Sequence, residues 1–442
     1  AQERSGPSYV SAPLCSSVEL PQAPPMSQSA APDVDLKSRG LSTQLAYGAC
    51  IVATLTVLAL NRSPSASDEL EKDKETGEES SSSMWFLWLV LWALKRLVQF
   101  VVGIFVMLVA VLVMKQRSIM YVPAPPGTAR SPKDNPDPFR SPASWGLPYE
   151  DVHVRTEDGT RVHAWLVYQR AETCKDRTPY TFIYFHGNAG NIGHRLENIR
   201  DMHQRLKVNV LIVDYRGYGD SDDGVSMGVS EKGFMMDATA TYRWLVKRIE
   251  NPVPSEPTRM SADRIMLFGR SIGGALSVVL MANILRDRIA GEAADGGALL
   301  PLPQGLILEN SFTSIKEMAV CLFPFLAIVR PLLRSPLLWD EWKAAESLDF
   351  LTANHEDWSC CLLSGLQDQI VPPAQMRQYH SILKARRPKI LKMFVFKHGG
   401  HNDTPIRGGA EYWQSFQKFM HLVYEADEER SKPKAEKQVK ES

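Results

Sequence analysis

The sequence has little cysteine and no excess of charge of either sign. Its 442 residues include 6 Cys, and 50 acidic side chains balance 50 basic ones for a net charge of 0. No two cysteines form a CxxC pair, so neither a zinc ribbon nor a small disulfide scaffold is supported. Nucleic-acid-binding domains are usually strongly basic, which this chain is not. We therefore expect no nucleic-acid partner and no metal ion or organic cofactor.

Residues 1–44 and 61–83 also lack the large apolar side chains that a folded core needs. Ser, Pro, Ala and Gln dominate residues 1–44, and residues 61–83 are acidic and Ser-rich, so we expect a disordered leader. Between them, residues 45–60 form an uncharged apolar run. Because a spanning helix usually needs about 17–25 residues, this run is a short span, a signal-peptide core or an interfacial helix.

A longer apolar run is present at residues 84–114, where we predict a membrane anchor. Its part 97–114 has eighteen residues, which at about 1.5 Å each cover roughly 27 Å, close to the thickness of a bilayer core. Trp85, Trp88 and Trp92 recur before it at helical spacing, as in an interfacial aromatic belt. The alternative is a buried core helix, but the run is apolar all round rather than on one face. We expect one membrane-spanning helix at 97–114, with the organelle left open.

The remaining chain divides into three parts by composition. Residues 115–148 are a Pro-rich connector that we expect to be extended, and residues 425–442 are a charged tail that we expect to be disordered. Residues 149–424 alternate between short apolar runs and helical stretches. This segment is the predicted folded domain.

The alternation within 149–424 predicts an α/β fold. Two alternating runs, 151–155 and 161–168, flank Glu157-Asp158-Gly159 and predict an antiparallel hairpin. Short apolar runs typical of buried parallel strands follow at 181–185, 208–214, 264–268, 305–308, 360–363 and 390–396. Helical stretches lie at 191–206, 231–249, 272–285 and 411–424. We predict a mostly parallel, eight-stranded sheet with helices on both faces.

A nucleophile motif follows one of these strands. The segment from Gly269 to Gly273 reads GRSIG and leads from an apolar run into a helix rich in small residues. In this context the glycines permit the sharp turn that exposes the hydroxyl of Ser271 at the edge of the sheet. The GxSxG pattern alone occurs by chance, so its position after a strand carries the interpretation.

The acid and the base of a catalytic triad are expected later in the chain. Asp368 follows the run CLLSG, and His401 follows the run ILKMFVF, in the order Ser, Asp, His that an α/β-hydrolase requires. Asp368 would orient His401, which would take the proton of Ser271. His398 is the competing base. We favour His401 because Gly399 and Gly400 allow the backbone to turn its side chain towards the strand ends.

Two backbone amides are expected to form the oxyanion hole. One belongs to Ile272, directly after the nucleophile, and the other to the loop HGNAGN after the run 181–185. Asn188 is the favoured second donor and Ala189 the alternative. The glycines of this loop superficially resemble a dinucleotide-binding motif, but their spacing is GxxGxxG and not GxGxxG.

An apolar insertion at residues 312–345 offers candidates for acyl binding. It lies among the loops around the strand ends, and we name Phe312, Phe323 and Phe325 as candidate substrate contacts. The alternative is that its helices only pack their apolar faces on the sheet.

Six motifs in order resemble one known family. IYFHGNAGNIGHRL, VDYRGYGDS, FGRSIGGA, LENSF, GLQDQIVPP and GGHNDT are similar to those of the Bem46-like α/β-hydrolases, over roughly residues 84–424. The resemblance implies the α/β-hydrolase fold behind an N-terminal transmembrane helix. It also implies a membrane-anchored serine hydrolase in which Ser271, Asp368 and His401 are the charge-relay residues.

The expected reaction is hydrolysis of an acyl ester or thioester through an acyl-enzyme. A related branch of the family removes palmitoyl groups from proteins, but it carries a Cys-rich N-terminus, whereas this chain has only Cys15 and Cys50 there. The expected substrate is therefore a lipid or an acylated protein, with depalmitoylation as one form. A catalytically silent membrane scaffold and a serine peptidase are the alternatives.

Overall fold

The computed structural model describes residues 82–174, 177–253, 259–293, 296–334, 337–386 and 388–431. The leader predicted for 1–83, apart from its last two residues, lies outside them, as does the apolar run 45–60. The chain divides into two compact units, Ala1–Leu108 and Val109–Ser442. We call the second the hydrolase unit.

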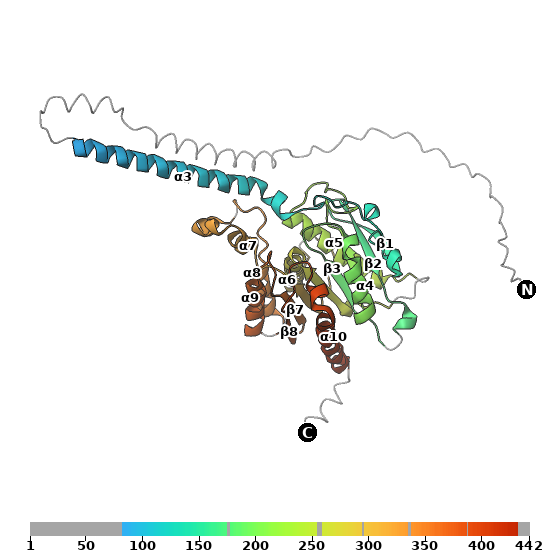
Figure 1. Cartoon of the computed structure of the whole chain (residues 1–442). Coiled ribbons are helices and arrows are strands. Elements are labelled where there is room, and N and C mark those ends of the chain that lie inside the picture. Colours follow the sequence, from blue (N-terminus) through green and yellow to red (C-terminus); the bar gives the residue numbers. More distant parts are fainter. Residues whose placement is uncertain are drawn as a thin grey trace, which may run out of the picture. The chain divides into compact units, whose positions relative to one another are not determined.

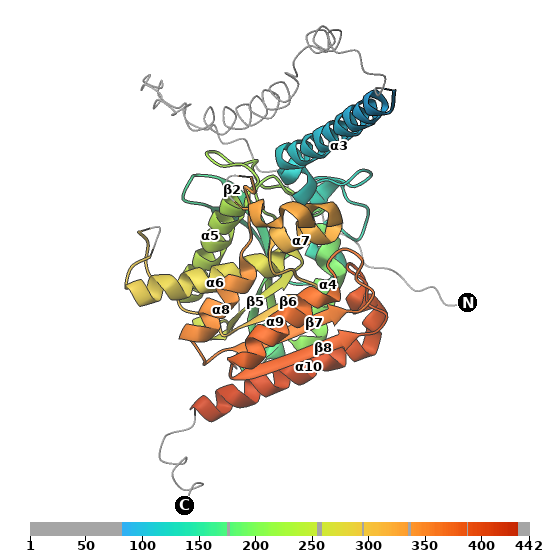
Figure 2. The ribbon, with the colours of Figure 1, turned by 90° about the vertical axis from the view of Figure 1, so that its left-hand side faces the viewer.

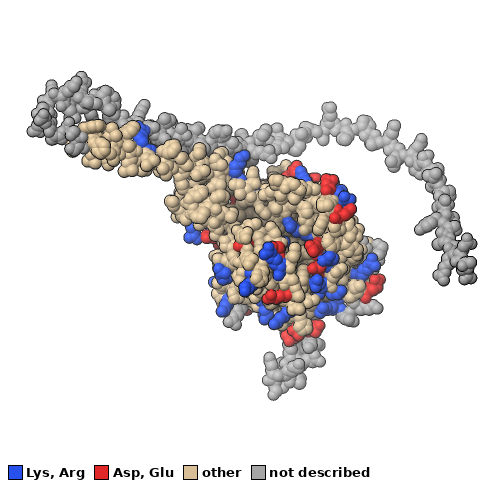
Figure 3. All heavy atoms as spheres, in the orientation of Figure 1, with Lys and Arg blue, Asp and Glu red and all other residues tan. Residues whose placement is uncertain are grey.

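Helix α3 (Ser82–Met120) is long and apolar. Within the described residues, Met84–Met120 is one helix with the length and composition to cross a membrane, and its most apolar window is not buried. In Figure 3 its surface is almost entirely tan, whereas acidic and basic side chains are scattered over the hydrolase unit. The helix continues to Met120, six residues past the predicted end of the anchor.

The hydrolase unit is built on one eight-stranded sheet with the order β1-β2-β4-β3-β5-β6-β7-β8 (Figures 1 and 2). The strands β1 to β8 are Tyr149–Arg155, Arg161–Val167, Thr181–Phe185, Asn209–Val213, Ile265–Arg270, Gly305–Glu309, Ser359–Gly365 and Ile390–Phe396. Strand β2 pairs antiparallel with β1 and β4, and the pairs from β4 to β8 are parallel. The strands from β3 to β7 are fully buried, which explains their continuous apolar runs.

Helices cover both faces of this sheet, as Figure 1 shows for α8 and α9 on one side and α10 on the other. One apolar cluster packs under α5 (Glu231–Glu250), α6 (Ile272–Ala290), α8 (Ala344–Asn354) and α9 (Pro373–Ala385). The other packs under α10 (Thr404–Ser431) and under three consecutive short helices, η4 (Ile192–Arg195), α4 (Leu196–Asp201) and η5 (Met202–Leu206). The predicted fold class, with eight strands, a mostly parallel sheet and helices on both faces, is confirmed.

The insertion after β6 forms a separate layer of helix. It contains α7 (Ile315–Leu322) and the 3-10 helix η7 (Pro324–Leu332). Only Met318 of α7 and Leu326 of η7 are buried, although both helices are rich in apolar residues. This layer therefore leaves apolar side chains outside the core.

Two boundaries differ from the expectation. The connector 115–148 is not extended, because after α3 it contains the 3-10 turns η1 (Pro132–Asp134) and η2 (Pro142–Trp145). A third 3-10 turn, η3 (Ala171–Thr173), follows within the domain. A buried hydrogen bond between Asn135 and Asn191 ties the connector to the loop after β3. Proline composition alone could not reveal this contact.

The charged tail begins later than expected, because α10 continues to Ser431. Residue Asp427 accepts a hydrogen bond from Tyr180 at 2.5 Å, and Arg430 donates to Gln304 and Asp357. These charged residues have partners in the domain, so charge content misplaced the boundary. A further 3-10 turn, η6 (Ala262–Arg264), precedes β5.

Candidate active site

Ser271 stands at the sharp turn between β5 and α6. Its φ of 55° is in a region that residues with a side chain seldom adopt, as expected for a strained nucleophile turn. The turn needs glycines on both sides. A Cβ at Gly269 would collide with the carbonyl oxygen of Gly273, and a Cβ at Gly273 with that of Phe185. The sequence folds this way because these positions have no side chain.

Asp368 and His401 meet across the ends of β7 and β8. The atom Nδ1 of His401 lies 2.8 Å from Oδ2 of Asp368. The other carboxylate oxygen accepts hydrogen bonds from the backbone amides of Ile370, at 2.9 Å, and Val371, at 2.8 Å. The carboxylate is thus held from two sides, and its contact with Nδ1 orients the imidazole so that Nδ1 donates and Nε2 is left as the acceptor nitrogen.

The loop of His401 is also tied to the nucleophile turn. Arg270, the neighbour of Ser271, donates from Nη2 to the carbonyl oxygen of His401 at 2.7 Å. Asn310, directly after β6, donates to the carbonyl oxygen of Gly400 at 3.1 Å and accepts from the amide of Gly365 at 2.8 Å. Sequence reasoning missed both positioning roles, although Arg270 lies inside the nucleophile motif and Asn310 inside LENSF.

His398, the competing base, is not the histidine that contacts Asp368. It is exposed in the turn after β8, whereas the side chain of His401 is 8% exposed and bound to Asp368. The geometry favours His401.

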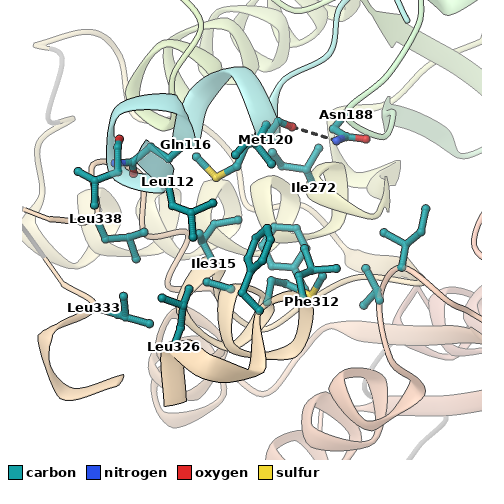
Figure 4. A pocket seen from close by; sticks show the side chains of 18 of the residues that line it. Leu112, Gln116, Met120, Asn188, Ile272, Phe312, Ile315, Leu326, Leu333 and Leu338 are labelled. Atoms are coloured by element: carbon teal, nitrogen blue, oxygen red, sulfur yellow. Dashed lines mark hydrogen bonds between the residues drawn. The ribbon is translucent and has the colours of Figure 1, made fainter. Parts of the chain in front are cut away.

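The residues that carry the expected oxyanion donors line a common pocket with Ser271. Asn188, Ser271 and Ile272 all line it. The side chain of Asn188 donates to the carbonyl oxygen of Met120 at 2.9 Å (Figure 4). The backbone carbonyl oxygen of Asn188 accepts from the amide of Val122 at 3.0 Å. The end of α3 therefore holds the loop that carries Asn188. The alternative donor, Ala189, pairs with Val122 in a short parallel bridge.

The pocket next to Ser271 is apolar and has a volume of about 180 Å³. Two candidate substrate residues, Phe312 and Phe323, line it. Phe325 instead packs on Phe323 with ring centroids 6.1 Å apart and is 36% exposed. Figure 4 shows side chains from α3, α7 and η7 converging on this space. The contribution of α3 had no signal in the local sequence.

A buried cluster of titratable groups lies behind the loop after β3. Burial raises the pKa of Asp214, whose carboxylate accepts from the amide of Ile192 at 3.0 Å. Nearby, burial lowers the pKa of His186 to about 3, so its ring is neutral at physiological pH. For His163, burial lowers the pKa, but Asp214 and Asp151 outweigh it and raise the pKa overall. Asp214 and His186 thus hold this loop through Ile192 and Gly187.

This arrangement has the parts of an acyl-transfer site: a serine on a strained turn, an oriented imidazole, and backbone amides beside a pocket. Within the part of the chain that the structure describes, no three His, Cys, Asp or Glu side chains form a group that could hold a metal ion.

Comparison with known proteins identifies the family. The chain is 36% identical over 331 residues to the α/β-hydrolase domain-containing protein WAV2 of Arabidopsis thaliana, covering 72% of this chain and 91% of that protein. It is 31% identical over 305 residues to the protein bem46 of Schizosaccharomyces pombe, covering 69% and 85%. The chain belongs to the Bem46/WAV2-like α/β-hydrolase family. The predicted family is confirmed, although no family model matches the chain.

Other members and more distant relatives were also found. The uncharacterized membrane protein YNL320W of Saccharomyces cerevisiae is 32% identical over 292 residues, covering 66% of this Bem46-family chain and 84% of that protein. The lysophosphatidylserine lipase ABHD12 of Danio rerio is 26% identical over 253 residues, covering 53% and 59%. Among solved structures, the esterase Pf2001 of Pyrococcus furiosus has a TM-score of 0.46 and 16% identity, covering 69% and 97%.

Proposed function

We propose that this protein is a membrane-anchored serine hydrolase that cleaves an acyl ester or thioester through an acyl-enzyme. The observation that carries the proposal is the pairing of His401 with Asp368 beside the strained turn of Ser271. Family membership supports it, since one relative is named an α/β-hydrolase domain-containing protein. Within the family, we propose on the six motifs that the chain is similar to α/β-hydrolase domain-containing protein 13.

The proposed reaction has two halves. Ser271 Oγ attacks the acyl carbonyl while Nε2 of His401 takes its proton, and the amides of Ile272 and Asn188 stabilise the oxyanion. His401 then gives the proton to the leaving alcohol or thiol, which departs and leaves an acyl-serine. Water attacks that ester with His401 as base, releasing the fatty acid and restoring Ser271.

The substrate class follows from the apolar pocket beside the nucleophile. A hydrocarbon chain suits its lining, so the acyl group belongs to a lipid or to an acylated protein, and depalmitoylation is included. The lysophospholipid lipase among the distant relatives supports a lipid ester. The apolar helix α3 supports membrane anchoring through one span at 97–114, and the relative named a membrane protein agrees with it.

A labelling experiment tests this proposal. A fluorophosphonate probe should label the full chain and the Ser381→Ala control, whose serine is exposed on α9, but not the Ser271→Ala variant. Hydrolysis of a butyryl ester should fall by about 10³-fold or more in His401→Gln, as in other triads, and persist in His398→Gln. Equal labelling of Ser271→Ala and the wild type would show that Ser271 is not the nucleophile. Turnover of amides but not esters would indicate a peptidase, and labelling without hydrolysis a silent scaffold.

A further inference from the structure

The last turns of α3 form one wall of the pocket beside the nucleophile. The wall residues recur three and four positions apart, which places them on one helix face: Val109, Leu112, Val113, Gln116, Ile119 and Met120. All of them belong to the hydrolase unit. Val111 and Met114 lie between them and are exposed. The helix thus has a pocket face and an outer face.

The opposite wall is the insertion after β6, which we call the cap (residues 315–334 and 337–340, with α7 and η7). Its pocket side includes Ile315, Leu326 and Leu333, which Figure 4 shows across the space from Leu112. The cap is joined to α3 by the buried side chain of Gln116.

Polar contacts hold this junction closed. Gln116 donates to the carbonyl oxygen of Leu337 at 3.1 Å and accepts from the amide of Trp339 at 2.9 Å. Arg117 forms a bidentate ion pair with the buried carboxylate of Asp340, at 2.8 and 3.0 Å. The amide of Gln116 is therefore occupied, and the wall that remains for a ligand is hydrocarbon.

The cap exposes several large apolar side chains outside the pocket: Phe325, Ile328, Leu332 and Trp339. Charged side chains lie among them, since Arg334 is exposed and Arg330 forms an ion pair with Glu317 at 2.8 Å. Ile328 is 79% exposed, so water contact here is costly unless another apolar phase covers it. The ring of Trp339 lies 5.6 Å from the guanidinium of Arg117, a pairing suited to the headgroup level of a bilayer.

The wall and the proposed membrane span share residues. Val109, Leu112 and Val113 line the pocket, and all three lie within the apolar segment 97–114. At about 1.5 Å per residue, Val109 lies roughly 7 Å inside the end of that span. A span that ends near Met114 therefore brings one end of the pocket to the depth of the lipid chains.

We propose that the pocket takes a long acyl chain directly from the bilayer leaflet, between α3 and a cap whose apolar outer side is immersed in that leaflet. This inference rests on the proposed function and specifies where its substrate lies. The acyl carbonyl reaches Ser271 while the leaving group stays towards the water. The substrates are accordingly long-chain acyl esters or thioesters that reside in the membrane.

The wall is tested with the full chain in proteoliposomes of phosphatidylcholine. Leu112→Trp places an indole in the pocket, and Val111→Trp places the same group on the outer face of the helix. Since one methylene in an apolar pocket is worth about 10–200-fold in specificity, we expect Leu112→Trp to lower kcat/KM for a palmitoyl ester at least tenfold. The deciding measure is the ratio of kcat/KM for the palmitoyl ester to kcat/KM for a soluble butyryl ester, which should fall in Leu112→Trp and keep its wild-type value in Val111→Trp.

The outcomes separate this inference from the proposed function. Suppose that the wild type hydrolyses the butyryl ester but Leu112→Trp and Val111→Trp have the same preference for acyl-chain length. The proposed role of α3 as a wall of the acyl pocket is then wrong, whereas the proposed hydrolase function is unaffected. If the wild type hydrolyses no ester or thioester of any length, the proposed function fails.

Delivery from the leaflet is tested separately. The substrates are a palmitoyl ester on a lipid whose second chain is ether-linked, and a palmitoyl-Cys transmembrane peptide, because neither leaves its bilayer readily. We expect the enzyme to hydrolyse at least one of them in its own vesicles, and the preferred one distinguishes lipid from protein sources. The variant Ile328→Glu should reduce this rate at least tenfold and leave butyryl ester hydrolysis unchanged. Unchanged hydrolysis of both membrane substrates in Ile328→Glu would overturn immersion of the cap.

Discussion

At the scale of single residues, the site depends on side chains that hold loops as well as on those proposed to react. His186 opens the loop that carries Asn188, and its Nδ1 donates to the carbonyl oxygen of Gly187 at 2.7 Å. Its ring packs on Tyr215, with centroids 4.6 Å apart, and is fully buried. A neutral histidine in this position couples the order of the loop to pH.

We predict that His186 makes the fold less stable as the pH falls. Its pKa is about 3 in the folded protein, because of burial, and about 6.5 when unfolded. Between these values the unfolded chain binds the extra proton, so the free energy of unfolding should drop by about 2 kcal/mol from pH 7 to pH 5 through this group. Denaturant titrations of His186→Gln in detergent should show a smaller drop. The control His421→Gln alters an exposed histidine and should match the wild type; equal pH dependence of all three would contradict the prediction.

At the scale of elements, the turn between β5 and α6 works because backbone replaces side chain. Gly273 approaches the carbonyl oxygens of Phe185 and His186 at the end of β3, so α6 starts directly against the neighbouring strand. This contact places Ser271 and the loop after β3 side by side. The start of α6 and the loop after β3 therefore supply the expected nucleophile and both expected oxyanion donors.

We predict that Gly273→Ala damages both stability and hydrolysis. The added Cβ collides with two backbone carbonyls, and such overpacking costs about 1–3 kcal/mol. The melting temperature and kcat for a butyryl ester should both fall. Gly228→Ala is the matched control, because its Cβ would meet nothing within 4 Å. A Gly273→Ala enzyme with wild-type kcat would show that the close approach is not needed for the nucleophile turn.

At the scale of the whole molecule, one apolar helix serves both compact units. Residues up to Leu108 belong to the first unit, and Val109 onwards to the hydrolase unit. The end of α3 lines the pocket and holds Asn188 through the carbonyl oxygen of Met120. The proposed anchor is therefore also part of the proposed site.

We predict that charge in the middle of α3 abolishes membrane integration. Lysine at the centre of a spanning helix costs about 2.5–3.5 kcal/mol, so the double variant Ile104→Lys/Val106→Lys should be released by alkaline carbonate. Met84→Lys places the same charge at the end of the helix and should remain with the membrane. Full retention of the double variant would point to another anchor, for which residues 45–60 are the candidate.

The sequence by itself determined the fold class and the positions of the eight strands along the chain. The six short apolar runs became the strands β3 to β8, because a buried parallel strand leaves a continuous apolar run, and the two alternating runs became the antiparallel hairpin of β1 and β2. The motifs around Ser271, Asp368 and His401 carry local backbone requirements, so they too could be recognised without coordinates. Their catalytic roles stay predictions.

Only the tertiary structure decided what surrounds those motifs. The hold of Arg270 and Asn310 on the loop of His401, the partners of Asp427 and Arg430, and the compact connector all join segments far apart in the chain. The wall contributed by α3 is the clearest case: residues such as Leu112 are equally apolar whether they face lipid or a pocket. Hydropathy records only that a side chain avoids water, whereas packing decides which apolar surface it meets.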